Sequence, residues 1–330
     1  MPKEISFDSG KDSRRPVRVG AIGELLVEFV AAQKDTRHLR PADYRGPFPS
    51  GAPGIFIDQA ARAGAEAIFA GAVGADAFGA VIRERLSSAG VDDRLIRTAE
   101  GIPTGSAFVA YNSDGSRDFV FNIAHSAAAR LPEAEECVAV LEAFGVDVFH
   151  ISGSALADPA MRTTALAVCR ALAERGAAIS LDPNIRKELL GESGYLDALW
   201  ELMELAAYVL PSDADAEVLF PGETFAAYAD RLLSAGKHAV VLKRGEEGCI
   251  GVARGGEMVS IPAHRVRMVD PTGAGDCFCA TFVTHFAGGR SLSDALAYAN
   301  AAGALAVGKI GPMEGNSSLG EIQALLEAST

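Results

Sequence analysis

Apolar residues in the second half of the chain form short continuous runs that are separated by longer amphipathic segments. Runs of this kind predict buried strands, and the segments between them predict helices. The expected strands are Val146–Ser152, Ala177–Asp182, Tyr208–Leu210 and His238–Lys243, and the expected helices lie near residues 133–143, 159–175, 194–206 and 224–235. Alternating strands and helices are typical of βαβ units. We therefore predict one α/β domain with a largely parallel sheet and helices on both of its faces.

The first 130 residues follow a less regular pattern. Residues 17–29 predict a strand, a turn and a second strand, and the strand expected at 68–73 lies between two expected helices. Segments 104–111 and 117–122 alternate apolar and polar residues around Asn-Ser-Asp-Gly, which predicts a hairpin. Residues 31–50 are polar and rich in proline, so we expect loops or short strands there. We expect residues 1–16 to be a flexible leader, followed by the domain over 17–330.

Composition narrows the class of protein. Hydrophobic residues make up 49% of the 330 residues and charged residues 22%, a balance that is ordinary for a globular protein. A net charge of −13 without a local Lys/Arg run argues against nucleic acid as a partner. The five scattered cysteines are typical of reduced thiols rather than of a disulfide framework. No apolar run is long enough to span a membrane and no secretory signal opens the chain, so we expect a cytoplasmic protein without a membrane partner.

Residues 268–286 carry the strongest chemical signal. A Gly-Ala-Gly turn precedes Asp276, and the following stretch has phenylalanine at every fourth position, which predicts a helix with one buried stripe. Small residues before a helix let a ligand approach the backbone, and the first N–H groups of the helix attract anions. A carboxylate beside such an anion needs a separate task, such as accepting a proton from a hydroxyl. The alternative is a glycine-rich turn in which Asp276 is an ordinary helix N-terminal residue.

The segment Asp270-Pro-Thr-Gly-Ala-Gly-Asp276 closely resembles the C-terminal signature of the ribokinase-like (PfkB) carbohydrate kinases. The resemblance covers most of residues 17–315, and it implies a ribokinase-like fold with a small β lid from about residues 31–50 and 104–122. It also implies ATP-dependent phosphorylation of a sugar hydroxyl with magnesium. In this family the last aspartate of the signature is the catalytic base and the preceding amides form an anion hole. The resemblance therefore assigns these catalytic roles to Asp276, Gly273, Ala274 and Gly275.

The resemblance also suggests how the sugar is bound. Glu28 stands where the family places an acid that binds sugar hydroxyls, and Gly51 lies in a segment similar to the family's Gly-Gly-Ala-Pro-Ala-Asn, with Ile55 in place of the sugar-contacting Asn. Asn122 and Arg186 complete the expected sugar contacts. The acidic side chains of the first strands leave an alternative open. They either line a polar cleft or face solvent at a sheet edge.

Nucleotide and metal positions follow from further family segments. Asn184, Lys243, Gly245, Gly248 and Asn300 are expected near ATP, although an exposed surface position is the default for a lysine. The pair that organises the magnesium waters in the family is represented by the residues Ser212 and Asp215. Asp270 and Thr272, with the loop at 308–311, resemble a site for a monovalent cation such as potassium.

The substrate expected from these residues is a neutral ketohexose, fructose or tagatose, phosphorylated at a primary hydroxyl. Acid-sugar kinases of the family typically have an arginine just after the second lid strand, where this chain has Ala124 and His125. 2-Keto-3-deoxygluconate remains the alternative substrate, because Arg186 could pair with its carboxylate. A non-catalytic sugar sensor is a more remote alternative, and a dehydrogenase is disfavoured because the chain lacks the dinucleotide fingerprint after its first strand. We also expect a homodimer.

Overall fold

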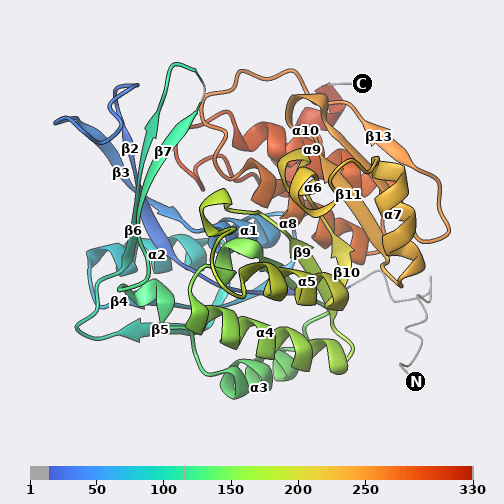
Figure 1. The fold of residues 1–330 in the computed structure, drawn as a ribbon, viewed down its shortest axis with the longest axis horizontal. Helices are drawn as coiled ribbons and strands as arrows, with labels where there is room; N and C mark the ends of the chain where they lie inside the picture. Colours follow the sequence, from blue (N-terminus) through green and yellow to red (C-terminus); the bar gives the residue numbers. More distant parts are fainter. Residues whose placement is uncertain (1–14, 115, 329–330) are drawn as a thin grey trace.

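The computed structural model describes residues 15–114 and 116–328, and it shows a large central sheet with a smaller sheet at one side (Figure 1). The central sheet has nine strands in the order β13-β12-β11-β10-β9-β8-β1-β4-β5. These strands are β1 Arg18–Ile22, β4 Glu66–Gly74, β5 Asp92–Ala99, β8 Val148–Ser152, β9 Ala178–Asp182, β10 Ala206–Val209, β11 Ala239–Lys243, β12 Cys249–Ala253 and β13 Val259–Ile261. Neighbouring strands from β11 to β5 in this order pair in parallel, whereas β12 pairs antiparallel with β11 and β13 pairs antiparallel with β12. The largely parallel sheet is thus confirmed.

Helices cover both faces of this sheet. Those whose side chains share one core with the sheet are α3 Ala134–Phe144, α4 Pro159–Glu174, α5 Tyr195–Leu205, α6 Asp213–Leu219 and α7 Phe225–Ser234. Those on the other face are α1 Ala52–Arg62, α2 Ala77–Ser88, α8 Ala274–Ala287 and α9 Leu292–Ala306, and α10 Leu319–Ala328 packs on α9. The four helices expected near 133–143, 159–175, 194–206 and 224–235 are confirmed as α3, α4, α5 and α7.

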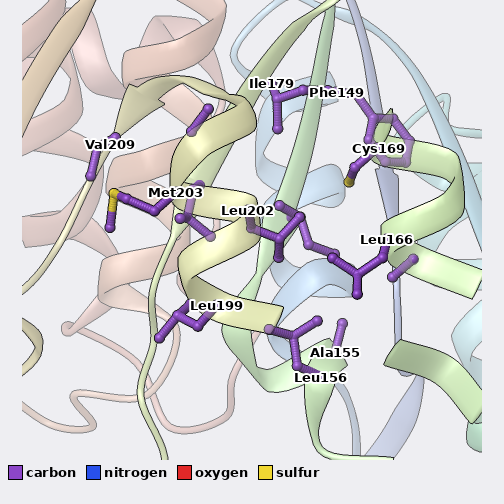
Figure 2. Close-up of a cluster of buried hydrophobic side chains, with 14 of the residues drawn as sticks. Phe149, Ala155, Leu156, Leu166, Cys169, Ile179, Leu199, Leu202, Met203 and Val209 are labelled. Carbon is purple, nitrogen blue, oxygen red and sulfur yellow. The ribbon is translucent and has the colours of Figure 1, made fainter. Parts of the chain in front are cut away.

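The alternation of side chains along each strand explains why the sheet has a hydrophobic core on each of its faces. In β4, Ile68 packs into the core with α3 to α5, whereas its neighbour Phe69 packs into the core with α1 and α8. In β11, Val240 and Val241 divide in the same way. Successive side chains of a strand point to opposite faces, so a continuous apolar run is what a sheet covered on both faces requires. Figure 2 shows the first core, where α4 and α5 pack against the sheet.

The smaller sheet, which we call the lid, has four strands in the order β3-β2-β6-β7. They are β2 Leu26–Ala31, β3 Tyr44–Ser50, β6 Gly105–Tyr111 and β7 Arg117–Asn122. The lid therefore contains β2 in addition to the segments expected from the sequence. The chain leaves the central sheet after β1 and enters the lid at Leu26, with Gly23 at φ 150° in the turn between them. Figure 1 shows the lid projecting from the body of the molecule.

The structure also contains elements that the sequence did not predict, namely β5, β12, β13, α6 and α10. The expected leader falls mostly on residues 1–14, which lie outside the described residues, as does Gly115 of the hairpin turn. All five cysteines are buried and free, as expected. Among the helices of the described ranges, none has both the length and the apolar character needed to cross a bilayer.

Candidate active site

The N-terminus of helix α8 is open. Gly273 precedes the helix with φ 83°, a left-handed conformation that favours glycine, and no side chain caps this end. Within residues 15–114 and 116–328, no acceptor pairs with the N–H of Gly275 or Asp276. A Cβ atom on Gly275 would meet only the Nζ of Lys243, at 3.7 Å. N–H groups without an acceptor at a helix N-terminus can form a cradle for a phosphate. The N–H of Ala274 lies 3.5 Å from the Pro271 carbonyl oxygen instead.

Asp276 is the third residue of α8 and is 9% exposed. No group in the described part of the chain donates a hydrogen bond to its carboxylate, so it does not act as a helix cap. Burial raises the pKa of Asp276 to about 8, and the charge of Asp182 adds to the rise, while Lys243 and Arg186 oppose it. A carboxyl group with a pKa near neutral pH suits the task of accepting and holding a proton.

Lys243 and Asp182 end the parallel strands β11 and β9, at the carboxyl edge of the sheet where ligands of such folds bind. The Nζ of Lys243 lies 2.6 Å from Oδ2 of Asp182 and 3.3 Å from Sγ of Cys279. The side chain of Lys243 is only 12% exposed, so a surface position for this lysine is wrong. Burial alone would lower the pKa of Lys243, but the neighbouring carboxylates and the Cys279 thiol raise it, so the ammonium group stays charged.

The candidate magnesium residues Ser212 and Asp215 form a capping box at the start of α6. Oδ2 of Asp215 accepts hydrogen bonds from the backbone and hydroxyl of Ser212, and Oδ1 accepts one from the backbone N–H of Ile185 at 2.8 Å. Each carboxylate oxygen accepts about two hydrogen bonds. Only Oδ1 therefore retains a lone pair, which fits one ordered water better than direct coordination. No group of three His, Cys, Asp or Glu side chains in the described residues is arranged to hold a metal ion.

Asp270 and Thr272 lie where the lid meets the signature loop. Asp270 is 1% exposed, and its carboxylate accepts hydrogen bonds from the Tyr111 hydroxyl, the Thr272 N–H and the Gly311 N–H. The hydroxyl of Tyr111 also lies 3.1 Å from Oγ1 of Thr272. The loop expected to contribute cation ligands thus contacts Asp270 directly, and Tyr111 on β6 is a partner that the sequence did not reveal.

The remaining candidate nucleotide residues shape the backbone around β11 and β12. A Cβ atom on Gly248 would overlap the Ile261 carbonyl oxygen, and Gly245 also has a positive φ, 50°. The side-chain amide of Asn300 donates to the Pro262 carbonyl oxygen at 2.7 Å, which leaves its own carbonyl oxygen as an acceptor. The side-chain amide of Asn184, at φ 37°, donates to the Ser152 hydroxyl at 3.1 Å.

Glu24 and Glu28 are both buried, at 5% and 3% exposure, so the alternative of solvent-facing side chains at a sheet edge is wrong. Ser50 donates to one oxygen of Glu28 at 3.3 Å, and the other oxygen is buried without a partner, as is one oxygen of Glu24. Burial raises the pKa of Glu28 to about 7, with Asp270 adding to the rise and Arg117 and Arg186 opposing it. Buried polar atoms without partners are costly, so these oxygens are candidate acceptors for the hydroxyl groups of a ligand.

Lid register separates Asn122 from Glu28. Residues paired directly across neighbouring strands share a face. Glu28 pairs with Ala107, which pairs with Phe121, whereas Asn122 pairs with Ser106. The side-chain amide of Asn122 accordingly donates to the Ser106 hydroxyl at 3.2 Å, on the opposite face of the lid from Glu28. The structure does not bring Asn122 together with the other predicted sugar contacts.

Gly51 and Ile55 have structural explanations. A Cβ atom on Gly51 would overlap the Glu24 carbonyl oxygen, and the φ of 105° also requires glycine. Ile55, which replaces the family's asparagine, is 2% exposed and packs against Cys277 and Met313. Gly51 thus lets the start of α1 approach the turn that carries Glu24.

Three side chains of β7 were missed as candidate sugar contacts. Arg117, Phe119 and Phe121 alternate along the strand and share the lid face of Glu28. The guanidinium of Arg117 lies 3.4 Å from Oγ1 of Thr272, and the rings of Phe119 and Phe121 stack with their centroids 5.2 Å apart. Phe121 is 48% exposed although it is a large apolar side chain. Their spacing at every second residue was the signal that could have revealed this surface.

Comparison with known proteins identifies the family. Residues 18–319 match the pfkB family of carbohydrate kinases. The chain belongs to this family. A PfkB carbohydrate kinase transfers a phosphoryl group from ATP to a sugar, so the expected enzyme class and the ribokinase-like fold are confirmed.

Relatives of the chain include proteins named fructokinase and ribokinase. Fructokinase-1 from Oryza sativa subsp. japonica is 30% identical over 331 residues, which cover 94% of this chain and 98% of that protein. Fructokinase-1 from Zea mays is 29% identical, with 94% and 97% covered. The E. coli structure described as ribokinase II is 39% identical with a TM-score of 0.89, over 94% of this chain and 99% of that one, and it has also been solved with ATP and Mg²⁺.

Proposed function

We propose that this kinase phosphorylates a primary hydroxyl of a neutral ketohexose, with fructose preferred and tagatose accepted. The observation that carries the proposal is Glu28, a buried carboxylate with one unpartnered oxygen on the lid face that meets the signature loop. A carboxylate accepts hydrogen bonds from sugar hydroxyls and repels a substrate carboxylate. The stacked rings of Phe119 and Phe121 suit the apolar C–H face of the sugar. The fructokinases among the relatives support this choice.

The residues of the phosphoryl site divide the chemistry among them. Asp276 accepts the proton of the sugar hydroxyl while that oxygen bonds to the γ-phosphorus of ATP, and the bond to ADP breaks with its electron pair on the ADP oxygen. The N–H groups of Gly275 and Asp276 and the ammonium group of Lys243 stabilise the negative charge on the transferred group. Phosphoryl transfer depends mainly on positioning and electrostatics, so this small set is sufficient.

Magnesium supplies neutralisation of the ATP phosphates, and the chain offers Asp215 as a residue that orients one of the metal's waters. The free lone pair on Oδ1 of Asp215 supports this role, since magnesium usually keeps several waters. Ser212 holds the carboxylate in place through the capping box. Asn184, Gly245, Gly248 and Asn300 stay proposed contacts of the nucleotide.

We also propose that Asp270 and Thr272, with the carbonyl groups of residues 308–311, bind potassium beside the phosphoryl site. The hydrogen bond from Gly311 to Oδ2 of Asp270, at 3.0 Å, ties that loop to the signature segment. Oxygen ligands of this kind suit a hard monovalent cation.

2-Keto-3-deoxygluconate is a second candidate substrate, and Arg117 is the observation that favours it. The sequence places no arginine after the second lid strand, but Arg117 at the start of that strand lies on the lid face of Glu28. The positive charge of Arg186 also lowers the pKa of Glu28. Two guanidinium groups near the sugar could pair with a substrate carboxylate.

Specificity constants decide between these substrates. ADP release should be measured with fructose, tagatose, ribose and 2-keto-3-deoxygluconate, with ribose included because of the E. coli relative's name. The position of the new phosphate should be determined by NMR. The proposal predicts the highest kcat/KM with fructose and a phosphate on a primary carbon. A lead for the keto acid or ribose would overturn the substrate, and no sugar-dependent ADP release would support a sugar sensor instead.

We further propose a homodimer in a reducing, cytoplasmic compartment. Five buried free thiols support the reducing compartment. Light scattering coupled to gel filtration tests the dimer, and a monomeric mass at micromolar concentration would contradict it.

A further inference from the structure

The ion pair between Asp182 and Lys243 requires an explanation beyond stability. Asp182 is 2% exposed, and Lys243 reaches it across β10, which lies between β9 and β11 and ends at Val209. The Cys279 thiol lies 3.4 Å from Oδ2 of Asp182, so three buried polar groups meet at one point. Buried ion pairs often stabilise a protein no better than apolar side chains of the same volume. A pair at the carboxyl ends of parallel strands, beside the proposed phosphoryl site, is therefore a candidate for a functional role.

The position of the ammonium group points to that role. Among the described residues beyond its chain neighbours and its own helix backbone, only Lys243 Nζ lies within 4 Å of where a Cβ of Gly275 would stand, at 3.7 Å. The ammonium group of Lys243 thus lies beside the free N–H groups of Gly275 and Asp276 and adds a positive charge to this phosphate cradle. A lysine side chain is long and flexible, so an ammonium group stays at one point only when its partners hold it there. Asp182 and Cys279 are those partners.

We propose that Asp182 is a positioning residue that holds the ammonium group of Lys243 against the phosphoryl group transferred from ATP. This inference rests on the proposed function. Lys243 contacts the transferred group, and Asp182 acts through Lys243 without contacting it. The arrangement places a fixed positive charge at the cradle before ATP arrives, so less reorganisation is needed as charge develops.

Asp182 and Lys243 shift the pKa of the proposed base, Asp276, in opposite directions. The charged and titratable groups that face Asp276 are Asp182 from β9, Lys243 from β11, Arg186 after β9, Glu24 after β1, and the thiols of Cys277 and Cys279 on α8 itself. Asp182 raises the pKa of Asp276, and Lys243 lowers it. Removing each charge should therefore shift the pH profile of the reaction in opposite senses. Opposed shifts would show that both charges act on Asp276.

A double-mutant cycle tests the inference. Lys243→Met should lower kcat about a hundredfold, as removal of one donor from an anion hole does. Asp182→Asn should lower kcat by a smaller factor, about tenfold, because a freed lysine still visits the site. If Asp182 acts through Lys243, the double variant should match Lys243→Met within about a factor of two. If the two effects multiplied instead, the double variant would be about tenfold slower than Lys243→Met. That result would show that the two residues act independently and would overturn the proposal.

The pH profile is the second readout. The rising limb of kcat/KM should move by about one pH unit, to lower pH in Asp182→Asn and to higher pH in Lys243→Met. Shifts in the same direction, or no shift, would contradict the electrostatic part. Asp147→Asn is the matched control, because Asp147 forms an ion pair with Arg15 at the amino edge of the same sheet. Its kcat should stay within about twofold of the unmodified protein.

Binding separates failure of this inference from failure of the proposed function. Calorimetry with ATP–Mg²⁺ and ADP–Mg²⁺ needs no sugar, and the unmodified protein should prefer ATP because Lys243 faces its γ-phosphate. Both single variants should lose most of this preference, whereas equal weakening of both nucleotides would indicate mere structural damage. If Asp182→Asn does not fold, as judged by its thermal transition, Asp182→Glu moves the carboxylate by one methylene. Unchanged nucleotide preference in that variant would overturn the proposal.

Discussion

The two parts of the proposed active site, the phosphoryl end and the sugar end, are built in different ways. The phosphoryl end combines the start of one helix with side chains at the ends of parallel strands, namely Gly275, Asp276, Asp182 and Lys243. The sugar end uses one face of the lid, where Glu28 and the side chains of β7 lie. The first end is held by a nine-stranded sheet with cores on both faces, and the second by a four-stranded sheet that projects from it (Figure 1). The proposed catalytic groups and the proposed sugar contacts thus lie on separate elements.

The largest effect should come from the phosphoryl end. Asp276→Asn should lower kcat by at least about a hundredfold while ATP still binds, because an amide cannot accept the hydroxyl proton. Asp294→Asn provides the matched control, since Asp294 is also the third residue of its helix but is exposed and pairs with Ser291. Its kcat should be that of the unmodified protein. Turnover of Asp276→Asn at the unmodified rate would remove Asp276 from its role as base.

The sugar end should respond in KM rather than in kcat. Glu28→Gln should raise the KM for the sugar about tenfold with little change for ATP, the effect expected from weakening a hydrogen bond to a charged group. Asn122→Ala should change the KM by less than about twofold, because Asn122 lies on the other face of the lid. Equal effects of the two substitutions would mean that the lid register does not separate their roles.

Potassium should have a smaller effect. At constant ionic strength, activity should rise several-fold when potassium replaces tetramethylammonium, because the cation would set the geometry of the loop that contacts Asp270. Asp270→Asn should reduce this response. A flat response to potassium would leave the 308–311 loop with a structural role only.

The smallest effect concerns stability. The pKa of Asp276 rises from 3.8 to about 8 on folding, so the stability that its protonated form provides is complete below 3.8 and is lost as pH rises through 8. Asparagine has no such proton to lose. The Tm of Asp276→Asn relative to the unmodified protein should therefore increase between pH 5 and pH 9, by about 1–2 °C or more. An unchanged difference would mean that the carboxylate is not held in a desolvated site.

The phosphoryl end was largely predictable because its parts are contiguous or regularly placed in the sequence. The Gly-Ala-Gly-Asp segment is local, and buried parallel strands read as continuous apolar runs whose last residues meet at one edge. The pairing of Lys243 with Asp182 was not predictable, since it depends on the strand order and on β10 ending early.

The sugar end was predicted less well because it depends on register. A shift of one residue moves a side chain to the other face of a strand. The alternation along β7 predicts that Phe121 and Asn122 lie on opposite faces, but the pairing of the strands decides which of the two faces carries Glu28. Arg117 contacts Thr272 across 155 positions of the chain. The place of β2 in the lid was hidden as well, because its residue Val27 packs into a core of the central sheet.

The pH dependence of kcat/KM for fructose tests the central claim most directly, namely that a buried Asp276 is the base of the phosphoryl end. The rate should rise with pH through an ionisation near 8, since only the deprotonated carboxylate accepts the hydroxyl proton. Glu28 has a raised pKa of about 7, so the profile should also be measured in Glu28→Gln, which should retain the ionisation near 8. A profile that is flat from pH 6 to 9.5 in both proteins would contradict the account.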